Sequence, residues 1–230
     1  MDDDLARDHE VVAVDMPGHG RSAAVRSTLV DGALQLGAVG GRAHYLGYSM
    51  GARFCLHLAL ARPQLVDSLV LISGTAGIED PDECLDRRRS DGALADRLDP
   101  TQADRPAQPV EEFLRVWMGN PMFAGIAPGA DGLTERLANT GPGLASSLRR
   151  AGTGTQLPLW GQLGRLAMPV LVITGGDDEK FSRLGSRMVD AIGAGASLAV
   201  VPESGHAPHL QHPGVVADLV RAHLARVGAD

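Results

Sequence analysis

The chain has 230 residues, of which 44% are hydrophobic and 21% charged, a composition typical of a globular protein with a sizeable core. Its formal net charge of −7 argues against the basic surface that nucleic-acid-binding proteins need. The acidic first residues lack an apolar signal segment, and no apolar run approaches the roughly 20 residues that span a bilayer. Neither Cys55 nor Cys84 has metal-ligand spacing, and we expect both to be reduced. We therefore expect a cytoplasmic protein, a monomer or small homo-oligomer, that binds neither nucleic acid nor a membrane.

Short apolar runs alternate with longer helical patterns, which indicates a parallel sheet flanked by helices. Strands are expected at residues 11–14, 44–46, 68–72, 170–173 and 197–201. The helices between them are expected at residues 28–39, 52–62, 182–192 and 215–227. From Gly74 to Leu166 only helical patterns occur, at residues 83–98, 110–118, 142–150 and 157–166. We interpret residues 74–166 as a helical cap insertion into a core formed by residues 1–73 and 167–230.

The segment Gly47-Tyr48-Ser49-Met50-Gly51 has the pattern Gly-x-Ser-x-Gly and lies between an expected strand and an expected helix. In such a turn the serine adopts strained backbone angles, so the flanking positions must be small. The turn exposes the hydroxyl at the N-terminus of the following helix, which favours negative charge. We predict that Ser49 is the nucleophile and that the Met50 amide is one oxyanion donor. The alternative is a glycine-rich turn with an incidental serine.

A nucleophilic serine needs a histidine, and His206 follows the last expected strand, at the sheet edge where sites of open α/β sheets assemble. The nearby alternatives are His209 and His212. The acid should follow the preceding strand, where three carboxylates are adjacent: Asp177, Asp178 and Glu179. Spacing does not choose among them, and any of them could instead cap a helix. The chain order serine, acid, histidine, each after a strand, is the order of the α/β-hydrolase fold.

Several segments outside these residues make the whole chain resemble the 2-succinyl-6-hydroxy-2,4-cyclohexadiene-1-carboxylate synthase family of the α/β-hydrolase superfamily. The most specific segments are residues 47–53, residues 147–156 with Leu159-Trp160, and residues 178–181. The cap also matches the family's aromatic pattern, at Phe113, Trp117, Pro121 and Phe123. Aligning Lys180-Phe181 to the family's Asp-x-Lys-Phe pattern selects Asp178 as the acid. The chain departs from the family at Ala52 and Gly176, where Gly and Glu are usual, and neither change touches a proton-transfer group.

The resemblance implies a lyase that removes a substrate proton and eliminates pyruvate, with the His206-activated Ser49 as the base and no acyl-enzyme. It implies no metal or organic cofactor. Because the substrate carries several carboxylates, arginines and hydrogen-bonding groups should line the pocket. The expected substrate-binding residues are Arg53, Arg149, Tyr48, Arg88, Lys180 and Trp117, with the first two preferred. The alternatives are a solvated helix face for residues 87–89 and cap packing for Trp117, Phe123 and Trp160.

The resemblance also implies a central strand and a His-Gly loop with a second oxyanion donor, between the strands ending at Asp15 and Leu46. Nothing before Val11 supplies them, and residues 2–8 look like the end of a helix. We therefore expect N-terminal strands to be missing and the reading frame to continue upstream of Met1. The segment ending at Asp15 should then stand apart from the strand ending at Leu46 or shift to pair with it. The competing functions are an inactive truncated fragment and a carboxylesterase or C–C bond hydrolase that uses Ser49 as a covalent nucleophile.

Overall fold

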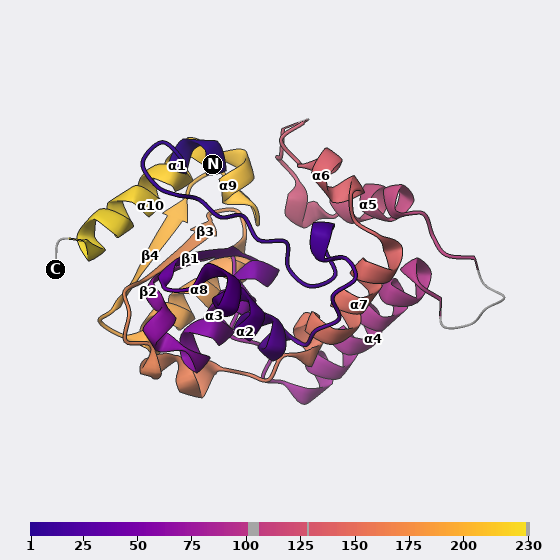
Figure 1. Cartoon of the computed structure of the whole chain (residues 1–230), viewed down its shortest axis with the longest axis horizontal. Coiled ribbons are helices and arrows are strands. Elements are labelled where there is room, and N and C mark those ends of the chain that lie inside the picture. The colour runs from indigo at the N-terminus through magenta and orange to yellow at the C-terminus, as the bar shows by residue number, and fades with distance from the viewer. Residues whose placement is uncertain (101–105, 128, 229–230) are drawn as a thin grey trace.

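A single parallel sheet forms the centre of the molecule (Figure 1). The structure is a computed structural model that describes residues 1–100, 106–127 and 129–228. The strands, hydrogen-bonded in the order β1-β2-β3-β4, are β1 (Ala43–Tyr48), β2 (Val66–Ile72), β3 (Val170–Gly175) and β4 (Ala196–Val201). The helices that surround them are α1 (Asp2–Leu5), α2 (Leu29–Gly40), α3 (Met50–Ala61), α8 (Glu179–Ile192), α9 (Pro208–Gln211) and α10 (Pro213–Val227). This arrangement is the expected α/β fold.

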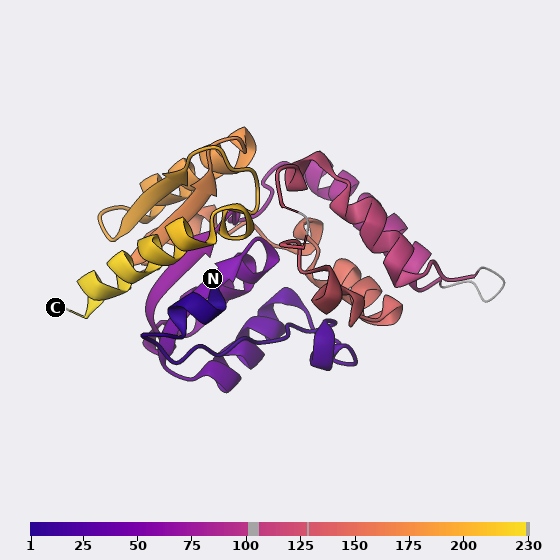
Figure 2. The ribbon, with the colours of Figure 1, turned by 90° about the horizontal axis from the view of Figure 1, so that it is seen from above.

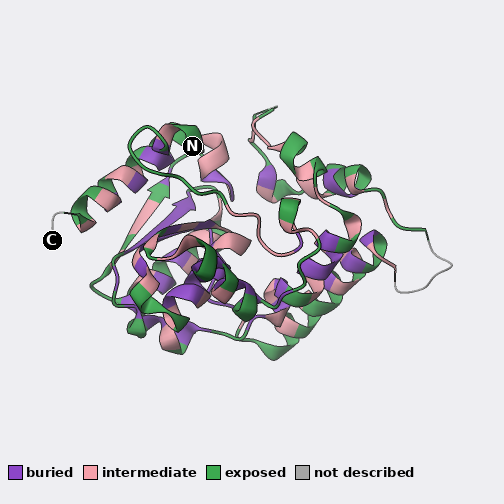
Figure 3. Ribbon diagram, in the orientation of Figure 1, coloured by how far each residue is buried: buried purple, intermediate pink, exposed green. Residues whose placement is uncertain are grey.

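Both faces of the sheet are buried, because successive strand residues point into two different apolar clusters. Leu69 and Leu71 of β2 pack with residues of α2, α3 and α8. The intervening Val70 and the last residue, Ile72, pack against α1 and α10 on the opposite face. The central strands β2 and β3 are almost entirely buried, whereas Figure 3 shows the edge strand β4 as partly exposed. The carboxyl ends of all four strands therefore meet at one edge of a rigid, covered sheet.

Four further helices lie together to one side of the sheet (Figure 2). They are α4 (Pro81–Leu98), α5 (Val110–Met118), α6 (Leu133–Leu137) and α7 (Gly141–Ala151). Three of them, α4, α5 and α7, share a small core of their own, formed by Ala95, Leu98, Phe113, Leu114 and Ala145. Asp80 begins α4, because its carboxylate accepts the Glu83 amide proton at 2.8 Å, and Thr140 caps α7 in the same way. The division into a core and a cap insertion at residues 74–166 stays a prediction.

Two expected helices differ from the structure. Residues 157–166 contain only the 3-10 helix η5 (Trp160–Arg165), because the segment holds two glycines, Gly161 and Gly164, which lower helix propensity. Helix α8 begins at Glu179, three residues before the expected start, because the Asp178 carboxylate accepts the Phe181 amide proton at 3.1 Å. No helix in the described ranges combines the length and the apolar character needed to cross a membrane.

The expected strand at residues 11–14 is wrong. These residues form an irregular segment with Val12 63% exposed, and no strand neighbours them in the sheet. A strand needs a partner to complete its hydrogen-bond ladder, so strand-like side chains alone are insufficient. The segment stands apart from β1, which is one of the two arrangements expected for it. It follows α1 and the turn after that helix, which Arg221 of α10 holds through Asp4 and Asp8 at 3.1 and 2.8 Å.

Candidate active site

Ser49 occupies the turn between β1 and α3 in a strained conformation. Its φ of 49° and ψ of −104° lie in a region that residues with a side chain rarely adopt. The Ser49 N–H donates a 2.8 Å hydrogen bond to the carbonyl oxygen of Ile72, which ties the turn to the end of β2. The strain is held by the packed sheet around it and projects the hydroxyl beyond the strand ends.

The structure brings Ser49, His206 and Asp178 into one hydrogen-bonded chain. The Ser49 Oγ lies 3.1 Å from the His206 Nε2, and the His206 Nδ1 lies 2.8 Å from the Asp178 Oδ2. Because an ionised carboxylate only accepts, Nδ1 carries the proton and Nε2 accepts from the serine hydroxyl. The three residues follow β1, β4 and β3, whose carboxyl ends lie at one sheet edge. His206, the middle member of this chain, is only 1% exposed, whereas Ser49 and Asp178 are partly exposed.

Asp178 is kept ionised by its neighbours. Burial alone raises the pKa of this carboxyl, but hydrogen bonds from His206 and the Phe181 amide, with the Lys180 charge, lower it below its ordinary value overall. The Phe181 ring also packs edge-on against His206, with ring centroids 4.3 Å apart. Asp177, the alternative acid, is exposed. The arrangement fixes the tautomer and the orientation of the imidazole.

Met50 is the first residue of α3, so its N–H has no acceptor within the helix and points out of the helix N-terminus. That position suits a donor to negative charge developing beside Ser49. The Met50 side chain faces α7, with its Sδ 3.5 Å from the Ser147 Oγ. Helix α7 therefore lies directly against the nucleophile turn.

Tyr48 and His209 form a second group beside the triad. The Tyr48 ring lies 4.2 Å from the ring of His209 and 5.4 Å from that of His206. Burial raises the pKa of Tyr48, and the charge of Arg136 opposes that rise. Burial, and after it the Arg136 charge, lowers the pKa of His209 to about 4. Burial also lowers the pKa of His19, again with Arg136 acting in the same direction.

Arg136 on α6 is a cation whose charge acts on Tyr48, His209 and His19, and sequence reasoning missed it. Its Nε donates to the Asp131 carbonyl oxygen at 2.9 Å, which anchors the side chain to its own loop. It lies on a five-residue helix that was not expected. The only available signal was a single arginine shortly before the Thr140 cap of α7, and no spacing rule singles out such a residue.

The structure does not bring Arg149 to the triad, in contrast to the expectation. Its guanidinium contacts the Asp96 Oδ1 and the Asp99 carbonyl oxygen at 2.8 Å, and the Asp99 Oδ2 at 3.4 Å. The reason is helical geometry: two residues correspond to about 200° of rotation, so Arg149 points away from the face where Ser147 meets Met50. Arg149 therefore joins α7 to the end of α4.

Arg53 is buried, 6% exposed, and donates from Nη1 to the Ala151 carbonyl oxygen at 2.8 Å. Burial lowers the pKa of Arg53 to about 10, so the group stays cationic at neutral pH. Arg88 also bonds within the protein, from its Nε to the Gly154 carbonyl oxygen. The substrate-binding roles of both arginines stay predictions, and the structure assigns each a structural contact.

The remaining expected binding residues, Lys180 and Trp117, form no hydrogen bond or ion pair with the triad side chains in the described structure. Lys180 is exposed next to Asp178. Trp117 stacks in the cap, with its ring 5.9 Å from Phe113 and 6.3 Å from Phe123. Trp160 belongs to the main core and donates from Nε1 to the Gly77 carbonyl oxygen at 2.9 Å. Within the described ranges, no three His, Cys, Asp or Glu side chains are grouped as a metal ion requires.

Gly47→Ala and Gly51→Ala are expected to have opposite effects, although both glycines belong to the motif. A Cβ at Gly47 would lie 2.5 Å from the Ala52 backbone nitrogen, whereas a Cβ at Gly51 would meet no atom within 4 Å. The expectation that both neighbours must be small therefore holds only for Gly47. Gly47→Ala should destabilise the fold by about 1–3 kcal/mol and lower activity. Gly51→Ala should stabilise α3 by up to about 1 kcal/mol. Urea unfolding of both variants tests this, and equal losses would contradict it.

Acid is expected to destabilise the protein through two half-buried histidines, His57 and His209. Burial lowers the folded-state pKa of His57 and of His209 to about 4, from an ordinary value of 6.5. Between these values the unfolded chain binds more protons, so the free energy of unfolding falls as the pH drops from about 6.5 to about 4. Each histidine should contribute roughly 1–3 kcal/mol. Urea unfolding near neutral pH and at about pH 5 should show a shallower pH dependence for His57→Leu and His209→Leu; unchanged slopes would refute this origin.

Comparisons with known proteins identify the family of the chain. The alpha/beta hydrolase family model matches residues 1–219. A 2-succinyl-6-hydroxy-2,4-cyclohexadiene-1-carboxylate synthase of Serratia proteamaculans (strain 568) is 32% identical over 227 residues, covering 94% of this chain and 84% of the relative. The solved structure of MenH from S. aureus has a TM-score of 0.84 and 25% identity, covering 94% of this chain and 83% of that one. A hydrolase from Pseudomonas aeruginosa PA01 has a TM-score of 0.73 and 26% identity, covering 96% and 82%. The chain therefore belongs to the alpha/beta hydrolase family and, within it, to the 2-succinyl-6-hydroxy-2,4-cyclohexadiene-1-carboxylate synthase family.

Proposed function

We propose that this enzyme is a lyase that eliminates pyruvate from a succinyl-enolpyruvyl-cyclohexene carboxylate. The product would be 2-succinyl-6-hydroxy-2,4-cyclohexadiene-1-carboxylate, the compound in the name of its Serratia relative. The observation that carries the proposal is the hydrogen-bonded chain from the Asp178 carboxylate through the buried His206 to the Ser49 hydroxyl. Such a chain is suited to removing a proton from a bound substrate.

In the proposed step, the Ser49 Oγ accepts the substrate proton while its own proton passes to the His206 Nε2. The C–H electron pair forms the new ring double bond, and the C–O bond to the enolpyruvyl group breaks. The leaving enolate takes up one proton and becomes pyruvate, so protons and electrons balance without a covalent intermediate. Asp178 stabilises the imidazolium, and the Met50 amide at the start of α3 favours the negative charge that develops nearby.

The charges around the triad favour substrate binding on one side of it. A cavity of about 720 Å³ on the Asp178 side includes Asp177, Glu179 and Glu203 among its lining residues, so several carboxylates face it. Tyr48 lies beside both His206 and His209, and the positive charge of Arg136 acts on Tyr48 and His209. Like charges repel, and arginine binds carboxylates in a fork. A polycarboxylate substrate should therefore bind on the Arg136 side.

A hydrolase on the same scaffold is the second candidate, because the Ser49–His206 distance of 3.1 Å also suits a covalent nucleophile. Two assays of the purified chain distinguish the reactions. Pyruvate release is followed through lactate dehydrogenase and NADH absorbance, and ester cleavage is followed with p-nitrophenyl acetate. We expect catalysed pyruvate release without a burst of an acyl-enzyme. Ester hydrolysis with a burst, and no pyruvate release above background, would assign the chain to the hydrolases instead.

A further inference from the structure

A carboxylate, that of Asp91, is buried between α4 and the end of α7. Asp91 is 3% exposed, and its Oδ1 accepts a 2.8 Å hydrogen bond from the Nε of Arg87, one helical turn earlier. Its Oδ2 is also buried and has no hydrogen-bond partner within the described residues. An unpaired oxygen on a buried carboxylate costs stability, so its presence calls for a reason other than packing.

Arg53 of α3 reaches the same place from the core. Its Nη1 donates to the Ala151 carbonyl oxygen at 2.8 Å, and a Cβ on the next residue, Gly152, would lie only 2.4 Å from the Asp91 Oδ2. The Arg53 and Asp91 side chains therefore converge on the end of α7. Arg53 is one helical turn beyond Ser49, and its amide donates to the Ser49 carbonyl oxygen at 3.3 Å. The cluster is thus close to the nucleophile turn.

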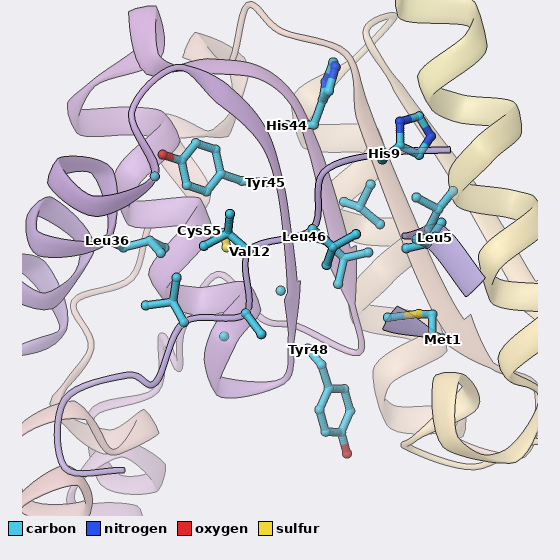
Figure 4. A pocket seen from close by; sticks show the side chains of 18 of the residues that line it. Met1, Leu5, His9, Val12, Leu36, His44, Tyr45, Leu46, Tyr48 and Cys55 are labelled. Atoms are coloured by element: carbon cyan, nitrogen blue, oxygen red, sulfur yellow. The ribbon is translucent and has the colours of Figure 1, made fainter. Parts of the chain in front are cut away.

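Arg53 lies on the face of α3 that is turned away from the free edge of β1. A cavity of about 530 Å³ runs along that edge, with Gly51 and Cys55 of α3 in its lining. Figure 4 shows Cys55 among the side chains around this cavity. Arg53 is two residues from each of them, or about 200° around the helix. It therefore points toward the cap, where it meets Ala151.

Two guanidinium groups influence each other in this cluster. Burial, and after it the charge of Arg87, lowers the pKa of Arg53 to about 10, and the charge of Asp91 acts in the opposite direction. The Arg53 side chain makes one hydrogen bond within the described residues, although a guanidinium has five N–H donors. Two cations and one carboxylate leave one positive charge in excess. A carboxylate of a bound molecule would balance that charge and use the free donors.

We propose that Asp91 is a positioning residue for substrate binding, which holds the Arg87 guanidinium beside Arg53 so that both cations meet one substrate carboxylate. The inference rests on the proposed lyase function, because that substrate has a further carboxylate besides the one expected at Arg136. The Arg87 side chain is 41% exposed, so without Asp91 it would be free to turn into solvent. Holding it in place before binding reduces the entropy lost on binding.

Arg89 on the same helix provides the contrast. It is 70% exposed and pairs at 3.3 Å with Asp86, which is 76% exposed, as expected for a solvated helix face. Such exposed pairs contribute little, because water screens them and both side chains lose freedom. Arg87 instead has a partner that is buried, so the solvated-face alternative describes Arg89 but not Arg87. The Asp86–Arg89 pair is the matched control for the Arg87–Asp91 pair.

The test measures KM and kcat for pyruvate release with variants of the full 230-residue chain. Asp91→Leu removes the acceptor and should raise KM about ten-fold, the loss expected when a charged hydrogen bond no longer orients the cation, with kcat nearly unchanged. Asp91→Asn keeps an oxygen that accepts from the Arg87 Nε and should recover most of this loss. Asp86→Asn should leave KM unchanged. The KM for p-nitrophenyl acetate, which has no carboxylate, should not change in any of these variants.

A double variant shows whether Asp91 acts through Arg87. In an Arg87→Ala background, Asp91→Leu should raise KM no further, and additive increases would overturn the proposal. An unchanged KM in a folded Asp91→Leu variant would leave Asp91 a structural role only. A lower KM would mean that Asp91 competes with the substrate for the arginines. Either result would overturn the proposal, as would an equal rise of KM for the neutral ester.

A binding measurement separates this inference from the proposed function. Failure of the proposed function would appear as absence of pyruvate release by the unaltered chain. Calorimetry with 2-succinylbenzoate, the dicarboxylate formed when the proposed product loses one water molecule, requires no turnover. Its Kd should rise about ten-fold in Asp91→Leu and stay unchanged in Asp86→Asn. Equal affinity for all three proteins, or no binding to the unaltered chain, would overturn the positioning role of Asp91.

Discussion

Ser49→Ala is expected to lower kcat for pyruvate elimination on the order of 10²- to 10⁴-fold, while the protein remains folded. The Ser49 Oγ ends the hydrogen-bonded chain, and in the proposed step it accepts the substrate proton, for which alanine offers no atom. His206→Ala should be about as damaging, because it removes the acceptor at 3.1 Å from that oxygen. Steady-state kinetics on both variants give the comparison.

The double variant of Ser49 and His206 makes the test specific. Residues that act as a unit show non-additive losses, so the double variant should be little slower than either single one. Circular dichroism and urea unfolding of each variant show whether the fold is intact. Near-normal turnover of a folded Ser49→Ala variant would remove the serine from the mechanism. Fully additive losses would mean that the two side chains act in separate steps.

Arg136→Ala is expected to lower kcat/KM for the polycarboxylate substrate by about 2–4 kcal/mol, the range for losing a close charge-paired hydrogen bond. The expectation follows from the effects of its charge on Tyr48 and His209 beside the triad. Arg149→Ala is the matched control, because its guanidinium is already paired with Asp96 and Asp99. It should change kcat/KM far less and act on the stability of the cap.

Turnover of a small neutral ester distinguishes a loss of carboxylate binding from a folding defect in these variants. Turnover of p-nitrophenyl acetate should change little in a folded Arg136→Ala variant, because the ester has no carboxylate to bind. Arg136→Lys should recover part of the loss, since lysine keeps the charge but lacks the planar fork. Arg149→Ala could instead show the larger loss of kcat/KM for the polycarboxylate substrate. The Arg149 side chain would then have to leave its aspartate partners when substrate binds, and the proposed substrate-binding role of Arg136 would be wrong.

The sequence by itself determined the features that depend on near neighbours along the chain. The strands β2, β3 and β4 and the strand-turn-helix around Ser49 are set by side-chain patterns and turn geometry within a few residues. The carboxylates at residues 177–179 were ambiguous because all three lie on one turn. The family pattern selected Asp178, and the structure places that residue against His206.

Only the tertiary structure decided which cations surround the triad and what becomes of residues 11–14. Arg53 meets Ala151 across 98 positions and Ser147 meets Met50 across 97, so the face that α7 turns toward the nucleophile depends on packing between distant segments. In the packed structure Arg149 is paired with Asp96 and Asp99, while the charge of Arg136 acts on Tyr48 and His209. Residues 11–14 have the side chains of a strand, but a strand is completed by hydrogen bonds to a neighbour, and along β1 that place is a cavity. Local pattern specifies what a segment can form, and its neighbours in space decide whether it does.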